Sequence, residues 1–167
     1  MKKSKILVIN LLIILFSCKK EGVTSEKKIN KEEKITLVFP DTVYINEAYD
    51  GKIDYINDLD TITTSFDDLQ KSRYIYYSYT KTKNISYVDN YLKKIRTDTC
   101  GARNNRLIPL YNIKFDKLGL NYFDGIITDE VMLENGAKGK KGEPMTRIIT
   151  DEIRLTRGVY VIERPKK

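Results

Sequence analysis

The sequence predicts a mainly β fold: a small antiparallel sandwich or barrel-like domain with one or two short helices, preceded by a targeting segment and a flexible tether. Two observations carry this prediction. Beyond residue 34, β-branched and aromatic residues occur in at least seven short runs, and turn residues separate the runs at intervals of about 8–12 residues, as in sandwiches and barrels. The chain has 167 residues, 41% of them hydrophobic, which is enough for one domain with a buried core.

The expected strands begin at residue 35. The run over 35–39 ends at Pro40, and Asp50-Gly51 between two β-prone runs is typical of a hairpin turn. Residues 73–80 have the highest density of β-favouring side chains and form the expected centre of the sheet. The other expected strands are 42–45, 52–56, 106–115, 122–133 (one long strand or a tight pair around Gly125), 147–150, 153–155 and 159–162, with a turn at Arg157-Gly158 and a solvated loop over 135–144.

Two segments are expected to be helical. Ser65 and Asp68 have the spacing of a capping box, which predicts a single helical turn over 65–68. Val88, Leu92 and Ile95 follow the spacing of one helix face. An aspartate lies at the start of this second segment and two lysines lie near its end, an arrangement that the helix dipole favours.

The N-terminus joins a basic start to a short apolar run. Lys2, Lys3 and Lys5 precede the apolar residues 6–16, a run too short to cross a bilayer as a helix, which takes about 20 residues. A basic region, a short apolar stretch and a small residue at the cleavage point are typical of a signal peptide. The tetrapeptide Leu15-Phe16-Ser17-Cys18 resembles the lipobox of bacterial lipoproteins.

This resemblance implies that the Cys18 thiol receives a diacylglyceryl group, that the leader is cut before Cys18, and that the new amine is acylated. Such chains form stable anchors, because each buried CH₂ contributes about 0.8 kcal/mol and two chains suffice. Lys19 follows the cysteine where an aspartate would signal retention at the inner membrane, so we expect the outer membrane. Whether the domain faces the periplasm or the outside is left open. The alternative is an ordinary secretory signal with an incidental cysteine.

The segment between Cys18 and the first expected strand is rich in Lys, Glu, Ser, Thr and Asn. So few apolar residues cannot offset the entropy of ordering, which predicts a flexible tether. The expected organisation is therefore a signal peptide over 1–17, a lipidated cysteine and tether over 18–34, and a single β-rich domain over 35–167.

The net charge of +7 is spread unevenly along the chain. Residues 1–17 carry +3, residues 18–34 carry +2, and residues 35–167 carry only +2. A nearly neutral body lacks the concentrated positive surface that nucleic-acid binding needs, so no nucleic-acid partner is expected. Within the body, residues 35–70 carry −7 and residues 71–167 carry +9. We expect these two parts to interleave and pair their charges; the alternative is a two-faced surface for a charged partner.

The chain has no histidine. This absence excludes Ser-His-Asp triads, Cys-His dyads and zinc sites built on histidine. Cys100 is the one thiol besides Cys18, and nearby Arg96 and Arg103 would favour a reactive thiolate. Without a histidine base, we interpret Cys100 as a half-buried residue beside a turn. No catalytic residue and no cofactor is therefore assigned.

An acidic cluster is a weak candidate for calcium. Asp50, Asp54, Asp58 and Asp60 lie close together in sequence and offer the hard oxygen ligands that Ca²⁺ prefers. Their spacing differs from that of a known calcium loop, because Gly51 precedes most of the cluster. A solvated acidic loop is the alternative interpretation.

Tyrosine is unusually frequent, with 12 in the chain and no tryptophan. Strand alternation places Tyr74 and Tyr76 on one face of the expected central strand and Tyr77 and Tyr79 on the other. Exposed tyrosines bind sugars, peptides and proteins, because the ring offers area and the hydroxyl offers a hydrogen bond. These four residues form the predicted binding surface, and ordinary core packing is the alternative for either pair.

These observations together predict a lipid-anchored protein of the bacterial cell envelope with a non-catalytic β domain that binds or scaffolds a partner. One alternative is a hydrolase of envelope polymers that uses paired carboxylates, since Asp and Glu are the plentiful acid–base groups. The other is a small inhibitor or immunity-type lipoprotein, which a flat apolar-aromatic patch would favour. The expected partners are the membrane, through the lipid, and a protein or polymer of the envelope.

Overall fold

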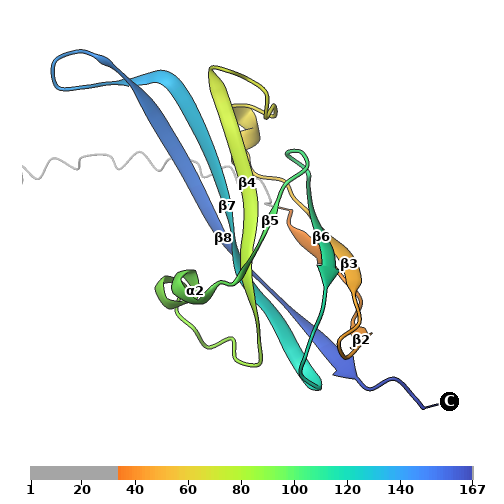
Figure 1. The fold of residues 1–167 in the computed structure, drawn as a ribbon. Coiled ribbons are helices and arrows are strands. Elements are labelled where there is room, and N and C mark those ends of the chain that lie inside the picture. The colour runs from red at the N-terminus through yellow and green to blue at the C-terminus, as the bar shows by residue number, and fades with distance from the viewer. Residues whose placement is uncertain (1–33, 167) are drawn as a thin grey trace, which may run out of the picture. The chain divides into compact units, whose positions relative to one another are not determined.

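The computed structural model describes residues 34–166 (Figure 1). The expected signal peptide, the lipobox with Cys18, and the tether up to residue 33 lie outside these residues. The elements of the described part are β1 (Thr36–Val38), β2 (Thr42–Tyr44), β3 (Tyr49–Asp54), the 3₁₀ helix η2 (Asp58–Thr61), β4 (Lys71–Thr82), α2 (Asp89–Ile95), β5 (Asp98–Gly101), β6 (Leu107–Ile113), β7 (Gly119–Lys138) and β8 (Pro144–Ile162).

The strands form two sheets that curl into a half-barrel (Figure 1). One sheet has three strands in the order β1-β3-β6, and the other has five in the order β2-β8-β7-β4-β5. The prediction of a mainly β fold is therefore confirmed. The strand pairs are antiparallel except for β2, which lies parallel to the end of β8.

The strands β4, β7 and β8 form the body of the larger sheet. β4 pairs with β7 along its whole length, from Lys71 to Thr82. β7 is one long strand through Gly125, and it forms a hairpin with β8 whose end projects beyond the other strands (Figure 1). Half of the expected loop over 135–144 therefore belongs to the two strands, and residues 139–143 form the turn between them.

The expected turn at Arg157-Gly158 is wrong. Both residues lie inside β8 and pair with β7 without a break in register. A Cβ atom on Gly158 would lie 3.4 Å from Leu120 and 3.5 Å from Tyr122. These are ordinary van der Waals distances, and Gly158 lies in regular strand, a setting that local sequence does not distinguish from a turn.

One of the two expected helices is present. α2 covers the segment predicted from Val88, Leu92 and Ile95, and Leu92 is fully buried. The turn expected over 65–68 is not helical. Ser65 and Asp68 instead accept hydrogen bonds from main-chain N–H groups two residues further on, which competes with helix formation.

The inner face of the larger sheet packs against β3 and β6 to form the core. Tyr77 and Tyr79 stack with their ring centroids 5.1 Å apart, and Phe123 meets Tyr79 edge-on. A Cβ atom on Gly125 would lie 2.5 Å from Tyr79 and 2.7 Å from the Tyr77 ring. Gly125 is therefore required for these two rings to lie across β7.

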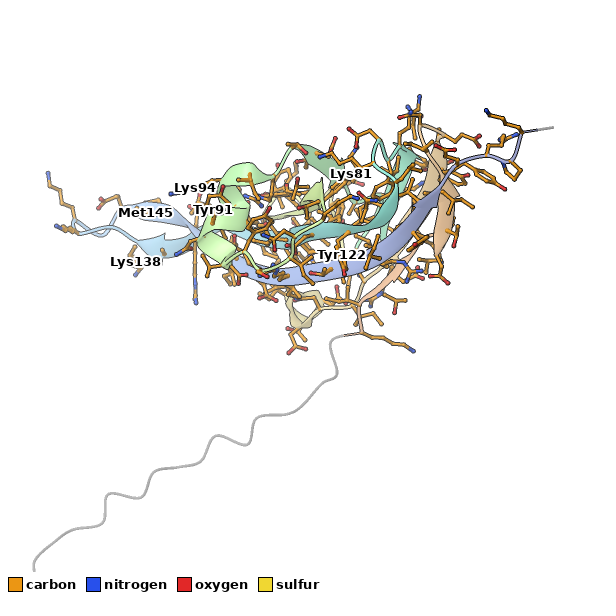
Figure 2. The ribbon with its side chains drawn as sticks, turned by 90° about the horizontal axis from the view of Figure 1, so that it is seen from below. Lys81, Tyr91, Lys94, Tyr122, Lys138 and Met145 are labelled. Carbon is orange, nitrogen blue, oxygen red and sulfur yellow. The ribbon has the colours of Figure 1, made fainter. Side chains whose placement is uncertain are left out.

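Helix α2 covers the middle of the outer face. Leu92 and Ile126 are buried there, and Arg154 on β8 holds the crossover that leads into the helix. The Arg154 guanidinium contacts Asp124 at 2.7 Å and donates to the main-chain oxygens of Ile85 and Tyr87 at 3.0 and 2.7 Å. The outer face is exposed toward both ends of the strands (Figure 2).

We predict that Ile75→Ala destabilises the protein far more than Tyr76→Ala. Ile75 is 3% exposed in the core, whereas Tyr76 lies half-buried on the outer face. A cavity at Ile75 should lower the free energy of unfolding by about 2–5 kcal/mol. Denaturant midpoints of both variants measure the difference. Equal midpoints would show that the inner face is not the core.

Candidate functional site

The four tyrosines of β4 separate cleanly between the two faces. Tyr77 and Tyr79 are 0% and 2% exposed, and burial raises the pKa of both hydroxyls well above the usual value for tyrosine. These two tyrosines belong to the core, which corrects their assignment to a binding surface. Tyr74 is 54% exposed and Tyr76 is half-buried, both on the outer face. The predicted binding surface is therefore reduced to Tyr74 and Tyr76.

Tyr74 and Tyr76 line a shallow groove of about 270 Å³, which is smaller than the roughly 300–1,000 Å³ of pockets that hold a small-molecule ligand. The groove lies where β5 ends at Gly101, because on the side away from β7 no described strand pairs with β4 between Lys71 and Ile75. Its other lining residues are Phe66, Arg73, Ile75, Gly101 and Ala102. The lining is mostly apolar, which suits an aromatic or aliphatic side chain of a partner.

Apolar side chains continue from this groove across the outer face. Tyr74 pairs with residue 130 of β7. Two residues further along β7, Met132 lies opposite Ile148 on β8. Ile148 is 57% exposed and Met132 is half-buried. We call Tyr74, Tyr76, Met132 and Ile148 the outer-face patch. The end of the β7–β8 hairpin extends beyond it and exposes Lys138 and Met145 (Figure 2).

A buried charge cluster lies on the opposite, inner face of the same strands. Arg73 on β4 is fully buried and donates to both oxygens of Asp129 on β7, from Nε at 2.9 Å and from Nη2 at 2.6 Å. Its Nη1 contacts Asp60 of η2 at 2.7 Å and the main-chain oxygen of Thr63 at 2.6 Å. The Tyr55 hydroxyl donates to Asp129 at 2.9 Å. Every nitrogen of the guanidinium therefore has a partner.

The carboxylates of this cluster are occupied by their partners. Asp60 also accepts from Asn105 at 3.0 Å and from Arg106. Burial raises the pKa of the Asp60 carboxyl, but hydrogen bonds from Asn105, Arg73 and Arg106 outweigh burial and hold the pKa below its ordinary value. Asp151 lies opposite Asp129 in the register and accepts from Asn57. With its lowered pKa, Asp60 is a poor proton donor near neutral pH, and the contacts of the cluster are those of a structural link.

Sequence patterning contains one signal for this cluster. Arg73, Ile75, Tyr77 and Tyr79 alternate onto one face of β4. An arginine at a core-facing position implies a buried carboxylate partner. The identity of that partner is not available from spacing, because Asp129 lies 56 residues away in the sequence.

The four aspartates of the calcium prediction do not converge. Asp50 accepts from the main-chain N–H of Asn112 at 2.8 Å, Asp54 pairs with Lys52 at 2.9 Å, and Asp60 lies in the buried cluster. Among residues 34–166, no three acidic or thiol side chains are placed to hold a metal ion. The described structure therefore does not bring the weak calcium candidates together, because Asp50, Asp54 and Asp60 make separate structural contacts.

Cys100 lies half-buried on β5, opposite Tyr77 of β4. Burial raises the pKa of its thiol, an effect that the hydrogen bond with Tyr79 only partly offsets. A raised pKa leaves less of the reactive thiolate at neutral pH. The geometry agrees with the structural interpretation of this residue.

The expected pairing between the acidic and basic parts of the chain is confirmed. Three acids from residues 35–70 contact arginines from residues 71–167, each at 2.7 Å; these pairs are Asp41 with Arg157, Glu47 with Arg164, and Asp60 with Arg73. The charge asymmetry along the chain thus holds the two sheets and the connecting segments together.

No family model, curated protein or solved structure matches this chain. Within residues 34–166, no helix has the length and apolar character needed to cross a membrane. The function is therefore argued from the site itself.

We predict that the Asp60→Asn variant loses less unfolding free energy than the unmodified protein when the pH falls below about 4. Because the folded-state pKa of Asp60 lies below 3.8, the ionised carboxylate stabilises the fold above that pH, and the contribution is lost as the pH falls through the folded-state value. Asp60→Asn should lower stability at pH 7 and change it less on acidification. Denaturant midpoints at pH 7 and pH 3 test this, with the exposed Asp58→Asn as control. Equal acid losses in Asp60→Asn and the unmodified protein would contradict it.

Proposed function

We propose that this chain is a bacterial lipoprotein, anchored through Cys18 in the outer membrane, whose β domain binds a partner in the cell envelope without catalysis. The observation that carries the binding role is the outer-face patch. Tyr74, which lines the groove together with Tyr76, and Ile148 on β8 are both more than half exposed. Exposed tyrosine with adjacent aliphatic side chains is the composition of protein-binding hot spots.

The anchor is proposed from the N-terminal sequence. Leu15-Phe16-Ser17-Cys18 follows a basic start and a short apolar run, and lipidation of a cysteine at this place gives a stable attachment to a membrane. The tether from residue 19 to residue 34 would allow the domain to reach on the order of 20 Å from the lipid, for a chain of this length and composition. Such a reach suits a partner that is itself close to the membrane.

The arrangement of carboxylates favours binding over hydrolysis. Glycoside hydrolysis needs two carboxyl groups about 5–10 Å apart with access to substrate. Among the described acids, Asp129 is 0% exposed and bound to Arg73 and Tyr55, and Asp124 is 0% exposed and bound to Arg154. A carboxylate held in this way is closed to a substrate.

A small inhibitor or immunity-type lipoprotein is the second candidate. The flatness of the outer-face patch favours it, because the groove beside Tyr74 holds only about 270 Å³ and flat aromatic surfaces suit protein partners more than small molecules. The two functions differ in the partner: an inhibitor blocks one enzyme or toxin, whereas a scaffold joins several envelope components.

We predict that Cys18→Ala leaves the domain folded but releases it from the membrane. The anchor and the tether precede the first core residue, Leu37, so the core does not depend on them. Membrane fractionation of the host, followed by proteolysis of the soluble form, measures both properties. A Cys18→Ala protein that is recovered only with membranes would overturn the anchor assignment.

We predict that Tyr74→Ala weakens binding of the envelope partner by about 30-fold, the loss typical of an aromatic hot-spot residue. The partner is first identified by photo-crosslinking from position 74 in the native host, and its Kd is then measured with purified proteins. Tyr111→Ala is the matched control, because Tyr111 is 64% exposed on β6 and lies on the other sheet. Equal Kd values for the two variants would exclude the outer-face patch as the binding surface.

A further inference from the structure

The β7–β8 hairpin projects beyond the other strands of the larger sheet (Figure 1). The pairing of β4 with β7 ends where Lys71 lies opposite Leu133, and the N–H of Glu134 donates to the oxygen of Gln70 at 3.0 Å. Beyond this point, β7, β8 and the turn between them have no main-chain partner outside the hairpin among the described residues. We call residues 135–146 the hairpin end.

The hairpin end is exposed on both sides. All of its residues are exposed except Ala137 and Gly139, which are half-buried. A two-stranded hairpin without a packed face is only marginally stable in water. A surface in contact with the hairpin end would therefore add burial that the rest of the described domain does not supply.

The hairpin end is basic. It carries three lysines and one glutamate, which gives a net charge of +2; these residues are Lys138, Lys140, Lys141 and Glu143. The Glu143 carboxylate bends toward the turn and accepts a hydrogen bond from the main-chain N–H of Lys141 at 2.9 Å. The ion pairs found within residues 34–166 all use other cations. Three ammonium groups thus lie together at the hairpin end without a carboxylate partner in the described part of the chain.

Met145 adds an apolar side chain to these cations. It is 50% exposed and lies opposite Ala137 in the hairpin register, and Figure 2 shows it with Lys138 on the projecting hairpin. Lysines beside an apolar side chain suit the surface of a bilayer, where the ammonium groups meet lipid phosphates and the apolar group enters the acyl boundary. A protein interface takes about 800 Å² from each partner around an apolar centre, which a narrow two-stranded ribbon does not offer.

The described part of the chain begins toward the same end of the larger sheet. Lys34 and Arg106 line one shallow hollow, and Arg106 pairs with Asp60, which also binds Arg73 near the start of β4. The start of β4 is where the hairpin leaves the sheet. The connection from Cys18 to Lys34 can span at most about 50 Å, more than the roughly 20 Å length of such a hairpin end. A lipid at Cys18 therefore allows the hairpin end to reach the same bilayer.

We infer that the hairpin end is a membrane contact, in which Lys138, Lys140 and Lys141 bind the headgroups of anionic phospholipids and Met145 enters the acyl boundary. This inference rests on the proposed anchor, which brings the domain to a bilayer, and it adds a second point of attachment. Two points of attachment restrict how the domain is oriented at the membrane, whereas a single lipidated tether leaves its orientation free.

A fluorescent probe on the hairpin end tests the contact in the full chain as it is processed by the host. Thr146→Cys in a Cys100→Ser background is purified from membranes, labelled, and reconstituted into phosphatidylcholine vesicles with or without phosphatidylglycerol, with brominated acyl chains as quencher. Thr42→Cys is the matched control, because Thr42 is exposed on β2, which pairs with the far end of β8. We expect phosphatidylglycerol to increase quenching several-fold at position 146 and to leave position 42 unchanged.

Charge variants test whether the lysines of the hairpin end carry the contact. The hairpin variant has three substitutions: Lys138→Gln, Lys140→Gln and Lys141→Gln. The control variant removes three exposed lysines beyond the other end of the hairpin strands: Lys114→Gln, Lys117→Gln and Lys166→Gln. Each lysine near an anionic surface strengthens binding about fivefold. The hairpin variant should therefore be quenched at position 146 only as strongly as in phosphatidylcholine alone, whereas the control variant should keep its quenching. Salt at about 1 M should act like the hairpin variant, because it shortens the Debye length to about 3 Å.

Three results would overturn the inference. The first is equal quenching at position 146 in the two kinds of vesicle. The second is an equal loss of quenching in the hairpin and control variants, which would indicate attraction by net charge alone. The third is a discrete protein adduct on photo-crosslinking from position 146 in the native host, which would assign the hairpin end to an acidic protein.

Flotation with the vesicles reports on the anchor separately. A protein that floats with both kinds of vesicle but is not quenched at position 146 keeps the anchor and contradicts the membrane contact of the hairpin end. A protein that floats with neither contradicts the proposed anchor, and the inference that rests on it fails as well.

Discussion

The buried pair of Arg73 and Asp129 is the contact on which the arrangement of the two sheets depends. It joins β4 to β7 through two hydrogen bonds in the core, and the same guanidinium fixes η2 through Asp60. Tyr55, which follows β3, reaches the pair through its hydroxyl. Removing one partner of such a pair leaves a buried charge and costs about 3–5 kcal/mol, a large part of the 5–15 kcal/mol that stabilises a typical domain. The contact therefore decides the relative positions of segments that are distant in sequence.

This contact and the aromatic core beside it decide which face of the larger sheet is buried. On the inner face, Tyr77 and Tyr79 lie across Gly125 and exclude water. On the outer face, Arg154 binds Asp124 and the crossover into α2, so that the helix covers the middle of the strands and leaves Tyr74 exposed at one end. The surface available to a partner is thus the part of the outer face that helix α2 does not cover.

The incomplete curl of the half-barrel relates the fold to the proposed function. A closed barrel has no free edges, whereas this one pairs β8 with β2 over only three residues and leaves the rest of that side open. The open edge and the outer-face patch lie on different parts of the same sheet. The outer face of this sheet therefore leaves Tyr74 and Ile148 accessible to a partner.

The sequence alone determined the fold class, the main strands and helix α2, because side-chain alternation and turn residues act over a few positions. It also predicted that Tyr74 and Tyr76 share a face, since alternation in a strand is a local property. It did not determine which of the two faces is buried, nor that the four aspartates serve separate contacts. Those outcomes depend on Asp129, Gly125 and Arg106, which lie far along the chain and reach β4 and η2 only through the register of the folded sheets. Tertiary structure decided them because burial belongs to the packed assembly of strands and not to any one segment.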